Sequence, residues 1–171
     1  VPHAGYIYSG PCAAGSYSRI SPDFDGTFVV IGTSHKGHPN SVSNLDWETP
    51  IGTVPSDTEF ADAVPLPKNN DIFREQENSL ETQMPFIAYR FPKAKVCAIL
   101  MGDQSLKGAA EISDAVISAV SKTNRRIIVA ASGDGSHYVP AKKAENDDLT
   151  CLAALKNLDI NAFYDALYAI Q

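Results

Sequence analysis

KVCAILMGDQ, residues 95–104, is the stretch that decides the fold class. From Val96 it runs through six apolar residues without the alternation of a half-exposed strand, and then meets a glycine and an aspartate. TFVVI at 27–31 and RIIVAA at 126–131 have the same character. Continuous apolar runs of this length are typical of a parallel sheet that is covered on both faces. We predict three fully buried strands, Thr27–Ile31, Lys95–Met101 and Arg126–Ala131.

Helical patterns lie between and after these strands. The predicted helices are Pro11–Ile20, Ser79–Phe91, Ser105–Thr123, Asp147–Leu158 and Asn161–Ile170. Asn78 is placed to cap the second helix, with Glu81 three residues later to complete a capping box. The excursion Gly37–Asn70, rich in proline and glycine, has room for a small hairpin around Trp47–Val54. Strand and helix in repeated succession predict a three-layer α/β fold with a mostly parallel central sheet.

The composition limits the classes of function. The 171 residues are 44% hydrophobic and 20% charged, which suits one compact domain over residues 1–171. A net charge of -6, without any run of five or more lysines and arginines, argues against nucleic acid as a partner. No apolar stretch approaches the roughly 20 residues that cross a bilayer, and the first residues lack the pattern of a signal peptide. We therefore expect a cytoplasmic protein with no membrane partner.

The two ends and the cysteines add further expectations. The chain starts at Val1 rather than methionine and its helical pattern stops abruptly at Gln171, so we expect both N- and C-terminal sequence to be missing. Cys12, Cys97 and Cys151 are an odd number at wide spacing, with no C-x-x-C pair. We predict that all three are reduced and buried in the core.

Polar side chains that can bind a metal or move a proton come after the predicted strands. They are His3, His35, Asp103, Gln104, Asp134 and His137. His3 follows Val1-Pro2, which has the character of the tail of a further strand. These residues lie in four loops, since Asp103 and Gln104 share one loop and Asp134 and His137 share another. Parallel strands end on one edge of a sheet, and ligands bind in the crevice outside that edge. We therefore expect the four loops to meet at one rim.

Imidazoles and a carboxylate in one crevice are ligands for a divalent transition metal. Two histidines and one carboxylate are the ligand set of non-haem Fe(II) oxygenases, and zinc accepts similar ligands. Any one histidine after a strand also suits a loop cap, so the agreement of four loops is what favours a metal. His38 has no partner in this pattern and is predicted to be a loop residue. Glu77 and Glu81 are predicted to place negative charge at a helix N-terminus.

Six blocks of the sequence resemble the Memo family in order and spacing. They are VPHAGYIYSGPCAA from residue 1, VVIGTSHKG from 29, DWETPIGTV from 46, ENSLETQMPF from 77, ILMGDQ from 99 and SGDGSHY from 132. The resemblance covers the chain from Val1 to about Leu167. The Memo family is similar in fold to the catalytic subunit of class III extradiol ring-cleavage dioxygenases, so the resemblance implies that fold here.

The resemblance also implies site residues. His3 of the PHAGY block and His35 of the G-x-x-H block correspond to the histidines of the family's metal site. Asp134 and His137 resemble the groups that line this site, with His137 as acid or base and Asp134 orienting it. The family's third ligand is a cysteine in a C-G-x-x-P segment, which we expect beyond Gln171, and Cys151 is not at the matching position.

Two departures from the family pattern bear on the site. The family usually has histidine where Asn78 stands, so one histidine near the pocket is absent. It usually has a serine and an aromatic residue where Gly133 and Gly135 stand. We expect the two glycines to loosen the loop that carries Asp134 and His137, because glycine adds backbone freedom.

Two functions of different classes follow from these residues and from the resemblance. The first is a redox metalloenzyme in which His3, His35 and a third ligand hold Fe(II), with Cu or Zn as alternatives. The second is a non-catalytic adaptor whose crevice binds a peptide or partner, as described for members of the family. Either function implies a small-molecule or peptide ligand in the crevice. A serine hydrolase is disfavoured because no G-x-S-x-G elbow is present.

Overall fold

The computed structural model describes residues 1–170, and the chain divides into two compact units. The first is Val1–Gly133 and the second is Asp134–Gln171, of which Gln171 lies outside the described residues. The two units are described separately below. The prediction of one domain over residues 1–171 stays a prediction.

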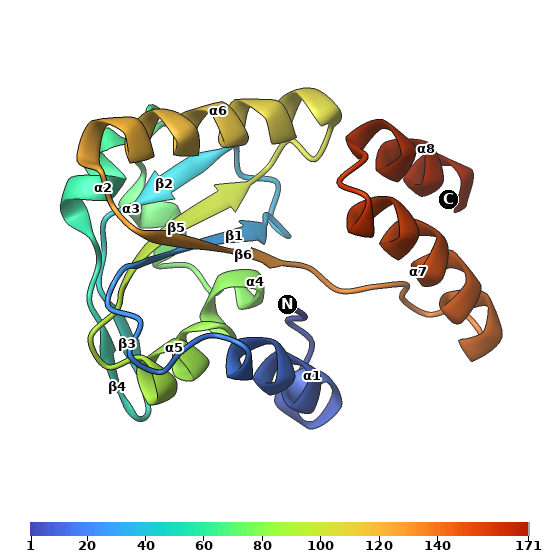
Figure 1. Ribbon diagram of the computed structural model, residues 1–171, viewed down its shortest axis with the longest axis horizontal. Coiled ribbons are helices and arrows are strands. Elements are labelled where there is room, and N and C mark those ends of the chain that lie inside the picture. Colours follow the sequence, from blue (N-terminus) through green and yellow to red (C-terminus); the bar gives the residue numbers. More distant parts are fainter. Residues whose placement is uncertain (171) are drawn as a thin grey trace. The chain divides into compact units, whose positions relative to one another are not determined.

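The first unit is built on a mixed four-stranded sheet with the order β2-β5-β1-β6 (Figure 1). β5 (Lys95–Met101) and β6 (Ile127–Ser132) both run parallel to β1 (Thr27–Thr33), one on each side. β2 (Ser41–Ser43) pairs antiparallel with β5. The three predicted strands are thus confirmed as elements, Lys95–Met101 with its bounds, whereas the three residues of β2 were too few to predict.

Helices cover both faces of this sheet, which confirms the three-layer α/β prediction. α1 (Tyr6–Ser18), α4 (Asn78–Glu81) and α5 (Met84–Arg90) lie on one face. α2 (Thr58–Ala63) and α6 (Leu106–Thr123) lie on the other (Figure 1). Since side chains alternate along a strand, β1 and β5 supply both layers of the core.

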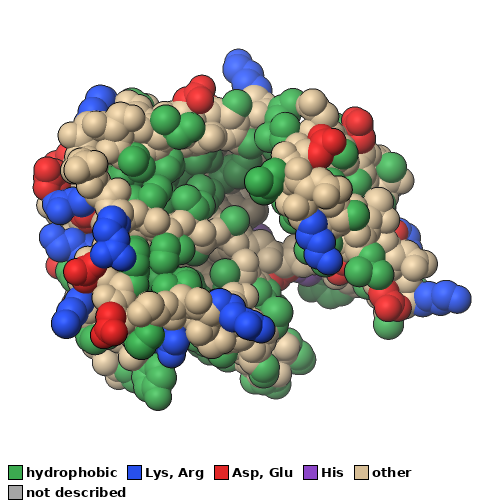
Figure 2. Space-filling view, in the orientation of Figure 1, with side chains coloured by type: hydrophobic (Ala, Val, Ile, Leu, Met, Phe, Trp, Pro, Cys, Tyr) green, Lys and Arg blue, Asp and Glu red, His purple; other side chains and the backbone are tan. Residues whose placement is uncertain are grey.

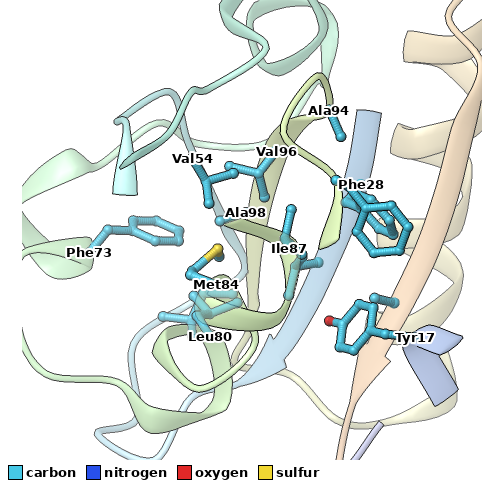
Figure 3. Close-up of a cluster of buried hydrophobic side chains, with 14 of the residues drawn as sticks. Tyr17, Phe28, Val54, Phe73, Leu80, Met84, Ile87, Ala94, Val96 and Ala98 are labelled. Carbon is cyan, nitrogen blue, oxygen red and sulfur yellow. The ribbon is translucent and has the colours of Figure 1, made fainter. Parts of the chain in front are cut away.

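The core on the α1–α5 face is rich in aromatic side chains. Phe28 of β1 is fully buried, and its ring centroid lies 4.8 Å from that of Phe91 and 6.1 Å from that of Tyr17. Figure 3 shows Tyr17, Met84 and Ile87 gathered against the sheet on this face. Helices α1 and α5 are therefore held in place by packing against β1.

The excursion between β1 and α4 contains the predicted hairpin and two short helices. β3 (Trp47–Thr49) and β4 (Gly52–Val54) pair antiparallel, which confirms the hairpin. α2 and α3 (Asn70–Phe73) were not predicted, because their helical segments of six and four residues are too short for a clear hydrophobic period. Each begins with a side-chain cap: Asp57 accepts a hydrogen bond from the Phe60 amide, and Asn69 accepts one from the Asp71 amide.

Two predicted helices of the first unit are corrected. The first begins at Tyr6 rather than Pro11, so Pro11 lies inside α1. The predicted helix Ser79–Phe91 is divided into α4 and α5. Its cap is Glu77 rather than Asn78, because Glu77 accepts a hydrogen bond from the Ser79 amide. Glu81 still reaches back, accepting from the Glu77 amide at 3.3 Å.

Burial corrects three further predictions. β6 is not fully buried, since Val129 is 51% exposed. Cys12 is exposed, because the buried face of α1 is formed by Ala13 and Tyr17. Cys151 is only partly buried, whereas Cys97 in β5 is buried as predicted.

An apolar groove runs between α6 and β6 in the first unit. Its lining residues are Ile31, Met101, Ala109, Ile112, Ser113, Val116, Ile117, Val120, Ser121, Ile127, Val129 and Ala131. Figure 2 shows hydrophobic side chains gathered below α6. β2 and β6 are the two edge strands of this sheet, and β6 is the more exposed of the two.

The second unit contains α7 (Ala141–Lys156) and α8 (Ile160–Ile170). α7 begins six residues before the predicted start at Asp147. The loop before α7 is fixed by Asp148, whose carboxylate accepts hydrogen bonds from the Ser136 amide and hydroxyl at 2.9 and 2.8 Å. Across residues 1–170, none of the helices is both long and apolar enough to cross a membrane.

Candidate functional site

His35 follows β1 and is oriented by a buried carboxylate. Its backbone amide donates to Glu77 Oε2 at 2.9 Å, and its ring Nδ1 lies 2.6 Å from Glu77 Oε1. An ionised carboxylate only accepts hydrogen bonds, so Nδ1 carries the proton and donates it. The lone pair for a ligand is therefore on Nε2, and the ring itself is about half exposed, at 48% of its side-chain surface.

The charge of Glu77 is stabilised by its donors. Burial raises the pKa of Glu77, but the hydrogen bonds that it accepts from His35 and Ser79 outweigh burial, so this pKa lies below its ordinary value. Glu77 is also the N-cap of α4, where a negative charge is favourable. The prediction that Glu77 serves a helix N-terminus is confirmed, and its pairing with His35 is an additional role.

His3 is buried beside the end of β6. Val1 N donates to the Ala131 carbonyl at 2.7 Å, and the Gly133 amide donates to the Val1 carbonyl at 3.0 Å. These two bonds have the pattern of a parallel pairing with β6. Two residues later, the His3 ring places Nδ1 3.1 Å from the hydroxyl oxygen of Ser132, the last residue of β6.

The start of α4 joins the two histidine segments. Glu77 holds His35, while the Asn78 side chain donates to the His3 carbonyl at 3.4 Å. The helix approaches β1 closely because position 32 is glycine: a Cβ there would lie 2.5 Å from the Ser79 hydroxyl oxygen. Ser79 in turn donates to the Thr33 carbonyl at 2.7 Å. Asn78 thus contacts the His3 segment through its side chain.

These contacts bring the two imidazoles together. The ring centroids of His3 and His35 are 5.3 Å apart, and the rings are nearly perpendicular at 87°. Both Nδ1 atoms have hydrogen-bond partners, Ser132 for His3 and Glu77 for His35. Metal-binding histidines usually engage their second ring nitrogen in this way, which fixes the ring and leaves Nε2 for the metal.

The donor set fits part of a metal site. Imidazole nitrogen is a suitable ligand for iron, copper and zinc. Within residues 1–170, however, no group of three His, Cys, Asp or Glu side chains is arranged to hold a metal ion. The first unit therefore brings together two imidazoles that are suitable as metal ligands.

Asp103 has a local structural role. Its carboxylate accepts a hydrogen bond from the Ser105 amide at 3.0 Å, just before α6 begins. Hydrogen bonds from Ser105 hold the pKa of Asp103 below its ordinary value. The turn is fixed from the other side by Asn40, whose side-chain oxygen accepts from the amides of Gly102 and Asp103. The expectation that Asp103 and Gln104 join the histidines stays a prediction.

His38 lies in the loop after β1, as predicted. Its ring Nε2 is 3.2 Å from Glu75 Oε2, and its amide donates to the Ser34 hydroxyl oxygen. Lys36 pairs with the same carboxylate at 3.3 Å. His38 therefore has an acidic partner of its own, which differs from the partner of His35.

Asp134 and His137 belong to the second unit. His137 Nε2 lies 3.5 Å from Asp134 Oδ2, three residues earlier in the same loop. An added Cβ at Gly135 would lie 2.5 Å from Asp148 Oδ2, so this glycine permits close approach to α7 in addition to any loosening of the loop. That Asp134 and His137 line the site of His3 and His35 stays a prediction.

The sequence analysis missed the contacts that orient the histidines: it did not single out Ser132, and it gave Glu77 only a role at a helix N-terminus. Ser132 and Glu77 lie 129 and 42 positions from the histidines that they contact. Gln83, which donates to Ser132, was also missed. Glu77 and Gln83 occur in the ENSLETQMPF block and Ser132 begins the SGDGSHY block, so the only signal was the resemblance.

The chain is similar to known proteins over nearly its whole length. Residues 1–171 match the profile of the family described as Memo-like protein. A MEMO1 family protein of Archaeoglobus fulgidus is 36% identical over 174 residues, which cover 99% of this chain and 66% of that protein. A MEMO1 family protein of Methanosarcina acetivorans is 38% identical over 172 residues, which cover 98% of this chain and 64% of that protein.

The matches cover the chain and its relatives to different extents. The chain spans slightly less than two thirds of the length of these two curated relatives. The family profile, in contrast, covers all 171 residues and includes the segments of His3 and His35. Since the family profile matches residues 1–171 and these relatives match 98–99% of the chain, the chain belongs to the Memo-like family.

Proposed function

We propose that this protein is a metal-dependent oxidoreductase that binds a non-haem metal ion through His3 and His35. Fe(II) is the proposed metal, with Cu or Zn as alternatives. The observation that carries the proposal is the perpendicular histidine pair, with ring centroids 5.3 Å apart and each Nδ1 beside its own oxygen partner. This arrangement supports ligation by the two Nε2 atoms.

The two histidines would hold the metal from different environments. His35 is hydrogen-bonded to the carboxylate of Glu77, which raises the basicity of the imidazole and makes it a stronger metal ligand. His3 is tied to the hydroxyl of Ser132 at the end of a strand, which restricts its ring. A third ligand is proposed from outside residues 1–171, and the Memo resemblance implies a cysteine.

A bound iron or copper ion would supply redox chemistry and open positions for a substrate or O2. The chain's own residues would orient the ligands and move a proton. We assign proton transfer to His137, with Asp134 orienting it, on the resemblance and on their 3.5 Å contact. The proposed ligand of the crevice is a small molecule or a peptide.

The test is an anaerobic Fe(II) titration of the full-length protein, followed by elemental analysis. We expect one iron per chain in the parent and loss of that iron in His3→Ala and His35→Ala. His38→Ala is the matched control, since His38 also has a carboxylate partner but is not part of the pair. His137→Gln should retain iron and lose O2 consumption with a panel of catechols.

A parent protein that binds neither iron, copper nor zinc would overturn the proposal. It would leave the alternative, a non-catalytic adaptor in which the same crevice binds a peptide. Iron that persists in both His3→Ala and His35→Ala would show that the metal is held elsewhere. Equal loss of iron in His38→Ala would point to a general effect of removing a histidine from this loop.

A further inference from the structure

A chain of buried hydrogen bonds leads from helix α1 to His3. The Tyr17 hydroxyl donates to Gln83 Oε1 at 3.0 Å, and Gln83 Nε2 donates to the Ser132 hydroxyl oxygen at 3.0 Å. Ser132 Oγ is in turn 3.1 Å from His3 Nδ1. Gln83 is completely buried, and the other three residues are buried as well. The chain thus joins α1, the start of α5, the end of β6 and the segment of His3.

The partners of Gln83 determine how its amide is oriented. Gln83 Nε2 lies 2.9 Å from the Pro2 carbonyl oxygen, which can only accept a hydrogen bond. The atom facing Pro2 is therefore the NH2 group, and its second hydrogen is available for Ser132. Burial raises the pKa of Tyr17, which keeps its hydroxyl protonated and able to donate to Gln83 Oε1. One set of donors and acceptors thus satisfies the whole amide.

This amide constrains the hydroxyl that contacts His3. By donating to Ser132 Oγ, Gln83 occupies one of the two lone pairs of that oxygen. A metal on His3 Nε2 requires a proton on Nδ1, which the remaining lone pair of Ser132 accepts. Gln83 also donates to Pro2, the residue directly before His3. It therefore restrains both the backbone and the ring partner of the histidine.

We propose that Gln83 is a positioning residue for His3, acting through Ser132 and Pro2 to fix the ring for metal binding. The proposal rests on the proposed function, because it concerns the same pair of histidines. Gln83 donates to Pro2 and Ser132 rather than to a histidine ring, so its effect on His3 is indirect. A buried glutamine in an apolar core is costly unless its amide is satisfied, and here Tyr17 satisfies the oxygen while Ser132 and Pro2 satisfy the NH2 group.

The test compares metal affinity in single and double variants of the full-length protein. Gln83→Met keeps the length of the side chain and removes both donors, and Ser132→Ala removes the hydroxyl. We expect each to weaken metal binding by roughly 10- to 100-fold while one metal per chain still binds. Because Gln83 acts on His3 partly through Ser132, the double variant should lose less metal affinity than the sum of the two single losses in binding free energy. Additive losses, or unchanged affinity in Gln83→Met, would overturn the proposal.

Ile87→Val controls for a general loss of packing. Ile87 is fully buried on α5 in the same core, and its side chain takes no part in the hydrogen bonds that lead from Tyr17 to His3. We expect it to lower the melting temperature and leave metal affinity within about twofold. With Cu(II) as probe, the nitrogen splitting in the electron paramagnetic resonance spectrum should show two imidazoles in the parent and Ile87→Val. It should show one in Gln83→Met if His3 is no longer held.

A measurement without metal separates this proposal from the proposed function. In the metal-free parent, the His3 ring protons should give one sharp set of nuclear magnetic resonance signals, because the ring is buried and held. In Gln83→Met they should broaden or double. If the parent binds no metal, the proposed function fails, and these signals alone decide whether Gln83 positions His3. Identical His3 signals in the parent and Gln83→Met would contradict the proposal.

Discussion

Strands β5 and β6 flank β1 on opposite sides, have similar apolar sequences and differ in burial. β5 lies between β1 and β2, and each residue from Val96 to Leu100 is at most 1% exposed. β6 pairs with β1 alone among the described strands, and Val129 at its centre is 51% exposed. Val129 lies in register with Val29 of β1, which is fully buried.

The difference is one of position in the sheet rather than composition. Of two neighbouring valines, Val29 in β1 is completely buried and Val129 in β6 is half exposed. An apolar run therefore specifies a strand but not how deeply the strand is buried. β6 also ends in Ser132, the partner of His3. The candidate site is therefore attached to the less buried of the two strands.

The largest effect should come from truncating the centre of β5. Ile99→Ala removes a fully buried side chain from the core between the sheet and α6. We expect the free energy of unfolding to fall by about 2–5 kcal/mol, because the lost apolar contacts leave a cavity. Urea denaturation followed by circular dichroism measures this loss. The slope of the unfolding free energy against urea concentration should stay unchanged. A loss below about 1 kcal/mol would show that β5 does not carry the core.

Sequence reasoning predicted the central elements because their signals are local. Lys95–Met101 was predicted with its bounds, since an apolar run ends there at a glycine and an aspartate. The start of α1 was missed because Pro11 was taken as the first helical position. The helix instead extends back to Tyr6 through Gly10, and Tyr17 stacks on Phe86 with ring centroids 5.5 Å apart. Tertiary packing of this kind overrides a local signal.

The candidate site was predicted in part. The resemblance and the strand ends both singled out His3 and His35, which the structure brings together. The residues that orient them could not be derived from spacing, because Glu77 and Ser132 are distant in sequence from the histidines that they contact. Long-range hydrogen bonds between side chains leave no periodic signal, so they become visible only when the chain is folded.

An intermediate effect should come from Cys97 in β5. Burial raises the pKa of its thiol to about 12 from an ordinary value of 9.0, and the negative charge of Asp57 adds to the shift. Between these two pH values the folded protein binds more protons than the unfolded chain, so stability falls as the pH rises from about 9 towards 12. From pH 8 to pH 10 this thiol should cost roughly 1 kcal/mol of unfolding free energy.

Cys97→Ala provides the matched comparison for this pH effect. The variant is destabilised near neutral pH by its lost contacts, but it has no thiol to ionise. The stability difference between the parent and Cys97→Ala, measured by urea denaturation at both pH values, should therefore narrow at pH 10. A difference that stays constant would mean that the thiol is accessible in the folded state, which alkylation of the native protein with iodoacetamide would reveal.

The smallest effect should come from Val129 in β6, and the same substitution in the neighbouring strand supplies the contrast. Val129→Thr keeps the branched shape and places a hydroxyl where water reaches, so we expect stability to change by no more than about 0.5 kcal/mol. Val29→Thr buries the hydroxyl among apolar side chains and should cost about 1–3 kcal/mol. Urea denaturation of both variants measures the contrast. Equal losses would show that the face of β6 is covered in the intact protein, and the difference between the strands would then disappear.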